Sequence, residues 1–88
     1  MYVILAYDIR VKRVSKVQNT VKQYLRPVQK SVFEGFLSEG ELNRLKAELL
    51  TRINTEEDSV RIYRIIGKGE VQMFGKTDDV KWEDVIII

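Results

Sequence analysis

Two stretches with the apolar spacing of a surface helix alternate with apolar, β-rich segments along this chain. Residues 2–8 are rich in β-formers and predict a buried strand. A helix is predicted over 11–25, because its valines recur at intervals of three and four residues, and Pro27 limits how far it can run. Residues 28–37 are extended, either as one bent strand or as two short strands divided near residues 30 and 31.

The second half of the chain continues this alternation. Ser38, followed three residues later by Glu41, forms a capping box and predicts a helix over 39–53. Strands over 59–66 and 70–74 are predicted to form a hairpin through a glycine-containing turn. This order of elements predicts an α+β sandwich with two helices on one face of an antiparallel sheet, for which the ferredoxin-like arrangement is the commonest solution.

The last four residues, Val85–Ile88, are all large and apolar. An exposed strand edge of this kind would aggregate, so we expect it to dock on this subunit's sheet or on a partner's. A single domain of 88 residues (1–88) without cysteine buries only about 60–65% of its unfolded surface. Dimerisation is the usual way to stabilise such a small core, and we expect a homodimer.

Composition excludes several classes of function. The chain has no cysteine and no histidine, which excludes disulfides, thiolate metal sites, zinc hydrolysis and imidazole acid–base chemistry. Any catalytic metal would need oxygen ligands, which favours Mg²⁺ or Mn²⁺. The apolar runs are too short to span a membrane and no secretory signal is recognisable. We therefore expect a soluble, cytoplasmic protein with no membrane partner.

Charge is distributed unevenly along the chain. Residues 1–30 hold seven basic residues and one acidic residue, a net charge of +6, whereas the remainder has a net charge of −4. This asymmetry predicts a face that binds a polyanion such as nucleic acid, although a solvated basic helix face accounts for it equally well. The candidate nucleic-acid-binding residues are Arg10, Lys12, Arg13, Lys16 and Arg26.

Asp8 is the only acidic residue among the first 30 and stands where the apolar run of residues 2–7 stops. A carboxylate at a strand end among cationic residues favours a divalent cation beside a phosphate chain. The alternative is that Asp8 caps the helix that follows. A lone carboxylate is a poor magnesium site, so the metal hypothesis requires two copies of Asp8, from two subunits, that share one ion.

Three neighbouring residues have structural and functional interpretations. Tyr7 points to the sheet face opposite Asp8 and is more typical of a core residue than of a catalytic one. Phe33 is expected in the core, with base stacking as the alternative. Glu34 is a candidate second acid, but a solvated or paired carboxylate is the commoner case.

The chain resembles the CRISPR-associated endoribonuclease family, the smaller of the two core proteins of CRISPR spacer acquisition. The resemblance rests on Tyr7-Asp8-Ile9, on Arg13-Val14, on the run from Val28 to Gly35, and on Asp58-Ser59-Val60-Arg61-Ile62-Tyr63. It extends over the whole chain, and the ordered set of motifs is more specific than any one of them. Many members carry an arginine at the position of Pro27, and the loop after Asp8 is shorter here than usual.

The resemblance implies a ferredoxin-like homodimer that scaffolds the integrase subunits on duplex DNA. Some members are also metal-dependent nucleases. By this resemblance Asp8 is a metal ligand shared between subunits, and Tyr7, Arg13 and Phe33 take part with Asp8 in nuclease function. It also implies that the C-terminal strand, Val85–Ile88, is exchanged between the subunits of the homodimer.

We therefore predict a CRISPR adaptation scaffold, with magnesium-dependent endonuclease activity on RNA or DNA as an additional hypothesis. Its predicted partners are a second copy of the chain, the integrase subunits, and duplex DNA or single-stranded RNA. The alternative function is a toxin-like ribonuclease or a generic RNA-binding module, because one fold supports many functions.

Overall fold

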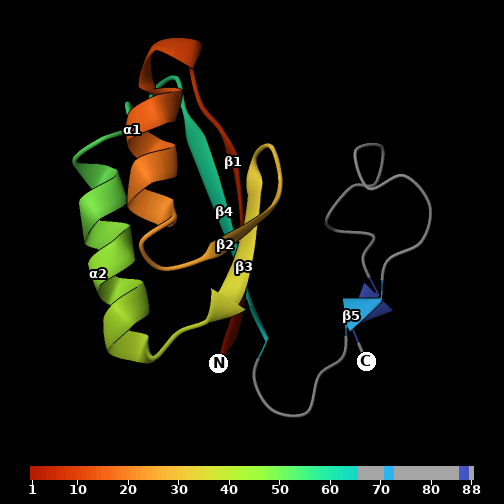
Figure 1. Ribbon diagram of the computed structural model, residues 1–88. Coiled ribbons are helices and arrows are strands. Elements are labelled where there is room, and N and C mark those ends of the chain that lie inside the picture. The colour runs from red at the N-terminus through yellow and green to blue at the C-terminus, as the bar shows by residue number, and fades with distance from the viewer. Residues whose placement is uncertain (66–70, 73–85, 88) are drawn as a thin grey trace.

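Two helices lie side by side over one face of an antiparallel sheet (Figure 1). The computed structural model describes residues 1–65 together with the backbone of residues 71–72 and 86–87. The elements, in chain order, are β1 (Tyr2–Asp8), α1 (Val11–Val21), β2 (Arg26–Gln29), β3 (Val32–Phe36), α2 (Glu39–Leu50), β4 (Ser59–Ile65), β5 (Val71–Gln72) and β6 (Ile86–Ile87). The β-α-β-β-α-β order of residues 1–65 is the predicted ferredoxin-like arrangement.

Within residues 1–65 the strands form a four-stranded sheet in the order β2-β3-β1-β4. Strand β1 lies inside the sheet and pairs antiparallel with β3 and with β4. Its register with β4 places Asp8 opposite Ser59. The end of β1 and the start of β4 therefore lie side by side at one end of the sheet. This brings the loop after Asp8 close to the turn before Ser59.

The extended segment after α1 is two strands, which settles the alternative that the sequence left open. Strand β2 pairs with β3 as a hairpin, and the register shifts between Pro27 and Gln29. Proline has no N–H to donate to a ladder, so it is tolerated on an edge strand beside such an irregularity. Strand β2 is an edge of this sheet, as that argument requires.

Both helices end earlier than their apolar periodicity predicts. Helix α1 ends at Val21 rather than at residue 25, and the amides of Tyr24 and Leu25 donate to the Val21 carbonyl in the turn that follows. Arg26 precedes a proline and must be extended, so the chain leaves the helix before it. Neither helix within residues 1–65 is long and apolar enough to cross a membrane.

The predicted capping box at the start of α2 is confirmed. The amide of Glu41 donates to Ser38 Oγ at 3.1 Å, and the amide of Ser38 donates to Glu41 Oε1 at 2.9 Å. Helix α2 ends at Leu50 rather than at residue 53, and Thr51 is its C-cap. The start of α2 follows from local side-chain chemistry, which is why the sequence locates it accurately.

The core lies between the sheet and the two helices. Alternate residues of β1 point into it, with Val3 and Leu5 fully buried. The helices contribute a valine pair from α1 and a leucine stripe from α2: Val17, Val21, Leu42, Leu45 and Leu49. The opposite face of the sheet has a smaller apolar cluster, Ile4, Val32 and Ile65.

The second strand of the predicted hairpin pairs elsewhere. Val71 and Gln72 of β5 pair antiparallel with Ile87 and Ile86 of β6, not with β4. The prediction of a β4–β5 hairpin was wrong because it considered only neighbouring segments, whereas the apolar C-terminal residues offer a β-branched partner strand. The apolar terminus is thus paired in part, and its exchange between subunits remains a prediction.

Candidate functional site

Asp8 is the last residue of β1 and its side chain is exposed. Tyr7 belongs to the core under the helices, so Asp8 faces the other side of the sheet. It does not cap α1, because the N-cap residue is Arg10 and no side chain makes a capping hydrogen bond there. The structure therefore contradicts the capping alternative for Asp8 and leaves its carboxylate available for another partner.

A buried carboxylate, Asp58, fixes the loop that follows Asp8. Its Oδ1 accepts from the amide of Arg10 at 2.9 Å and from Arg13 Nη2 at 2.9 Å. Its Oδ2 accepts from Arg13 Nε at 2.6 Å and from the amide of Asn54 at 2.8 Å. This one side chain ties the start of α1 to the turn before β4 and is itself fully buried.

The electrostatics of this cluster follow from those contacts. Hydrogen bonds from Arg13, and then from the amides of Arg10 and Asn54, hold the pKa of Asp58 far below its usual range, against the opposing effect of burial. The hydrogen bonds that Arg13 donates to Asp58, and then to Glu57, raise the pKa of Arg13. Glu57 Oε1 lies 3.0 Å from Arg13 Nη2, so the guanidinium contacts two carboxylates. The charge of Arg13 is therefore largely neutralised within the chain.

Tyr7 and Phe33 lie together in the core rather than beside Asp8. Their rings are stacked, with centroids 6.0 Å apart and an interplanar angle of 26°. Phe33 is 1% exposed, and Tyr7 Oη donates to the Lys30 carbonyl at 3.3 Å. Burial raises the pKa of the Tyr7 phenol. The structural interpretation of both residues is confirmed, and their role in nuclease chemistry remains a prediction.

The five candidate nucleic-acid-binding residues are not on one surface. Arg10, Lys12 and Lys16 are exposed at and near the start of α1, and Arg10 Nε lies 3.9 Å from a Glu57 oxygen. Arg26 belongs to β2, where its Nη2 lies 3.0 Å from Glu34 Oε1.

The pairing with Arg26 makes Glu34 a paired carboxylate, not a second acid beside Asp8. Glu34 lies opposite Ile4 in the sheet, well along β1 from Asp8. Within the described residues no group of three or more acidic side chains is placed to hold a metal ion. Among the acidic residues of the described sheet, Asp8 is therefore the exposed carboxylate at this strand end, whereas Glu57 in the turn before β4 is paired with Arg10 and Arg13.

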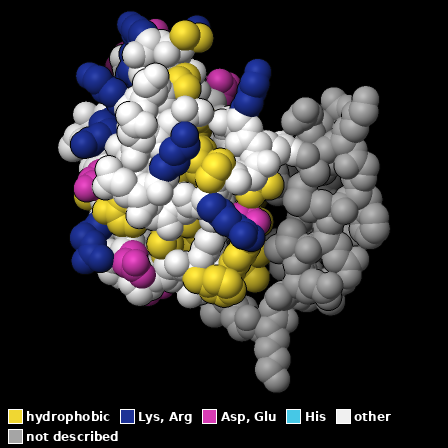
Figure 2. Space-filling model, viewed as in Figure 1, with side chains coloured by type: hydrophobic (Ala, Val, Ile, Leu, Met, Phe, Trp, Pro, Cys, Tyr) yellow, Lys and Arg dark blue, Asp and Glu magenta, His cyan; other side chains and the backbone are white. Residues whose placement is uncertain are grey.

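Figure 2 shows how charged and apolar side chains are distributed over one face. Lys and Arg side chains are spread along the side formed by the helices, with acidic side chains between them. Apolar side chains gather at the lower edge of the described part, near the end of β3. Phe36, the last residue of β3, is 77% exposed and its ring packs edge-on against Tyr2.

Sequence reasoning did not identify Asp58 as the anchor of the site. In the sequence, Asp58 precedes a predicted strand and begins one of the motifs that carry the family resemblance, but neither observation gives it a partner. Its role depends on the antiparallel register that places Ser59 opposite Asp8. The register between two strands that are far apart in the sequence cannot be predicted from one sequence alone. The signal that was available is the polar turn at residues 54–58 next to a strand start.

Comparison with known proteins gives a consistent result. The model of the family described as CRISPR associated protein Cas2 matches residues 1–73. A Thermotoga maritima protein named CRISPR-associated endoribonuclease Cas2 is 49% identical over 63 residues, 72% of each chain. A Thermococcus kodakarensis protein of the same name is 40% identical over 75 residues, covering 85% of this chain and 88% of its own. The crystal structure of Streptococcus pyogenes Cas2 superposes with a TM-score of 0.69 and 32% identity, over 77% of this chain and 88% of the other.

The family model spans every element of the four-stranded sheet and both helices. It also includes the strand end at Asp8 and the loop anchored by Asp58. The likeness in sequence and the likeness in fold therefore cover the same part of the molecule. The chain belongs to the family of CRISPR-associated protein Cas2.

Proposed function

We propose that this chain acts in CRISPR adaptation as a homodimer that holds the integrase subunits on duplex DNA. Family membership supports the role in adaptation. The net charge of +6 over residues 1–30, with Arg10, Lys12 and Lys16 exposed, supports contact with a nucleic-acid backbone. Val28 on β2 and Phe36 at the end of β3 are large apolar side chains that stay exposed in one chain, which supports burial against a second subunit.

The scaffold role is tested by association. Purified chain and integrase are mixed with and without duplex DNA and separated by size-exclusion chromatography. We expect co-elution, with DNA strengthening the complex. Separate elution under both conditions would refute the scaffold role.

We further propose that paired Asp8 carboxylates hold Mg²⁺ or Mn²⁺. The observation that carries this proposal is an exposed strand-end carboxylate that does not cap the adjacent helix. Carboxylate oxygens are ligands that these ions prefer, and a second Asp8 from the partner would supply the ligand that one chain lacks. When bound, the ion would polarise a scissile phosphate and lower the pKa of a water molecule.

The residues around Asp8 would fix its position in such a site. Asp58 holds the amide of Arg10, two residues beyond Asp8, and thereby fixes the path of the loop. The Arg13 guanidinium is already engaged by Asp58 and Glu57, so its contribution would be to hold this loop rather than to contact substrate.

Cleavage of single-stranded RNA and of duplex DNA tests this second role. We expect chelation and Asp8→Ala each to abolish it, whereas Glu56→Ala, which removes an exposed acid of the turn before β4, leaves it intact. Equal cleavage by the wild-type and Asp8→Ala proteins would assign the activity to a contaminant.

A further inference from the structure

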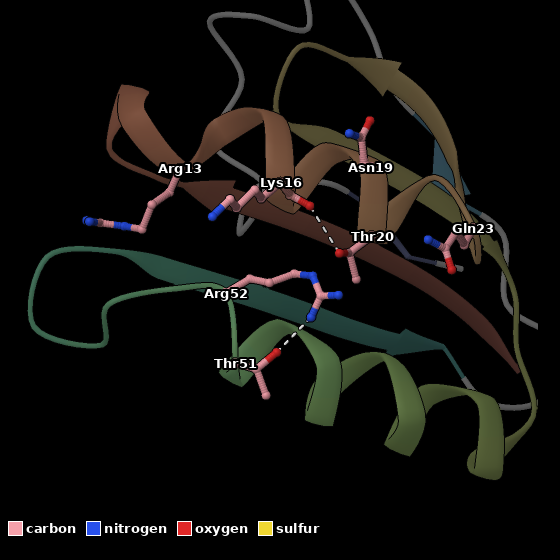
Figure 3. Close-up of a pocket in the computed structure, with 7 residues that line it drawn as sticks. All are labelled: Arg13, Lys16, Asn19, Thr20, Gln23, Thr51 and Arg52. Atoms are coloured by element: carbon pink, nitrogen blue, oxygen red, sulfur yellow. Dashed lines mark hydrogen bonds between the residues drawn. The ribbon is translucent and has the colours of Figure 1, made fainter.

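A groove of about 580 Å³ runs between α1 and the C-terminal end of α2. Lys16 and Asn19 line it from α1, Gln23 lines it from the turn after α1, and Thr51 and Arg52 line it from the turn after α2 (Figure 3). Arg13 lies at one end of the groove, and Arg52 reaches across it toward Thr20. No carboxylate is among the described residues that line it, so the groove is polar and cationic.

Two hydrogen bonds, both donated by one nitrogen, hold the guanidinium of Arg52 in place. Nη1 donates to Thr51 Oγ1 at 2.7 Å and to the Glu48 carbonyl at 3.2 Å. The described residues provide no partner for its other nitrogens and no carboxylate for its charge. A planar guanidinium held in this way loses little side-chain entropy when it binds a tetrahedral oxyanion.

Lys16 provides the second charge from the facing wall. It is exposed, and within residues 1–65 its ammonium forms no ion pair. Arg13 adds little, because Asp58 and Glu57 neutralise it. The two cations available to a ligand are therefore Lys16 and Arg52, with the amides of Asn19 and Gln23 as neutral donors nearby.

Capping of α2 is the competing explanation for Arg52. A basic side chain near a helix C-terminus commonly bonds the last carbonyls, and Nη1 does so here. Capping does not explain the absence of acidic residues from the groove or the presence of Lys16 on the opposite wall. The negative end of the helix dipole opposes an anion there, and Thr51 Oγ1 and Arg52 Nη1 offset part of that field by donating to the Glu48 carbonyl.

We propose that this groove binds a phosphate group between Lys16 and Arg52. The groove is open along the helices, so it admits a phosphate of a nucleic-acid strand as well as a free phosphate. This site rests on the proposed contact with nucleic acid and deepens it, because it assigns a phosphate to Lys16 and Arg52, and it needs neither Asp8 nor a metal ion.

The test is binding of labelled single-stranded RNA and labelled duplex DNA, measured by fluorescence anisotropy in the presence of a chelator. The Lys16→Gln/Arg52→Gln double variant is compared with a Lys22→Gln/Lys46→Gln double variant, which removes the same charge from exposed positions outside the groove. We expect the groove variant to weaken binding of at least one nucleic acid at least about tenfold, and the control variant less than about threefold. Equal weakening by both variants would overturn the proposal, because it would show an effect of net charge alone.

Two further variants keep the test decisive if Arg52→Gln destabilises α2. Lys16→Gln leaves the Arg52 capping bonds intact and is expected to weaken binding about threefold or more. Arg52→Lys keeps the charge without the planar fork and should fall between wild type and Arg52→Gln. Unchanged nucleic-acid binding by a folded Lys16→Gln protein would show that nucleic acid is not the source of the phosphate, and it would overturn the proposal if inorganic phosphate also fails to bind.

A second arm distinguishes the source of the phosphate. Inorganic phosphate is titrated while the amide resonances of Thr20 and Thr51 are followed by NMR. Shifts that vanish in Lys16→Gln, combined with unaltered nucleic-acid binding by the variants, would identify a small phosphate ligand. No shifts and no effect on nucleic acid would exclude the site. Both arms are run with a chelator present, so neither depends on the metal site, and failure of the metal site is distinguished from failure of this one.

Discussion

Phe33 provides a sharp test of whether a residue expected in nuclease function acts through chemistry or through packing. Its ring is 1% exposed and stacks on Tyr7 in the layer beneath the helices. Phe33→Ala removes most of a large buried side chain and should cost about 3–5 kcal/mol of the free energy of unfolding. Phe33→Leu keeps most of the apolar volume and should cost less than about 1.5 kcal/mol.

These costs translate into different thermal stabilities. A domain of this size loses about 4–8 °C in Tm for each kcal/mol, so Phe33→Ala should melt at least about 12 °C below the wild type. Circular dichroism follows unfolding, and RNA cleavage and integrase association are measured at a temperature where each variant is folded. We expect both functions to follow the folded fraction, with Phe33→Leu close to wild type. A stably folded Phe33→Leu protein that has lost either function would refute the packing explanation.

Three further predictions concern single contacts. Asp58 has a lowered pKa in the folded chain, so its stabilising contribution is complete above its unfolded pKa of about 3.9 and is lost on acidification below it. Denaturant titrations at neutral and acid pH should therefore show a smaller loss on acidification for Asp58→Asn than for wild type, and an equal loss would be inconsistent with that linkage. Ser38→Ala should lower the free energy of unfolding by about 1 kcal/mol in urea, because it removes the α2 cap; no change would show that the cap is redundant. Tyr7→Phe should cost about 0.5–1.5 kcal/mol through loss of the bond to the Lys30 carbonyl and leave nuclease activity unchanged; a folded but inactive variant would assign the phenol to the chemistry.

The parts of the fold that local chemistry determines could be predicted from the sequence. The run ending at Asp8 matches β1, and the Ser38–Glu41 pair locates the start of α2. Helix C-termini were harder to predict, because apolar spacing continues past the point where the chain must turn. Whether the segment after α1 was one strand or two depended on pairing between β2 and β3, which the sequence does not display.

The candidate site was predicted in part. The exposure of Asp8 at a strand end follows from the abrupt end of an apolar run, and the structure agrees. Arg13 was expected to face phosphate, but Asp58, 45 residues away in sequence, binds its guanidinium. The significance of Arg52 could not be predicted, because it depends on the packing of α1 against α2, which places Arg52 and Lys16 on opposite walls of one groove. Both arrangements arise from tertiary packing, which the spacing of apolar residues along the sequence does not reveal.

Calorimetric titration of Mg²⁺ into the purified protein tests the proposed Asp8 site most directly. If two strand-end aspartates share an ion across a twofold axis, the titration shows one ion for each pair of chains. Asp8→Ala should abolish that binding, and Glu56→Ala should preserve it. Magnesium binding that survives Asp8→Ala would contradict the account.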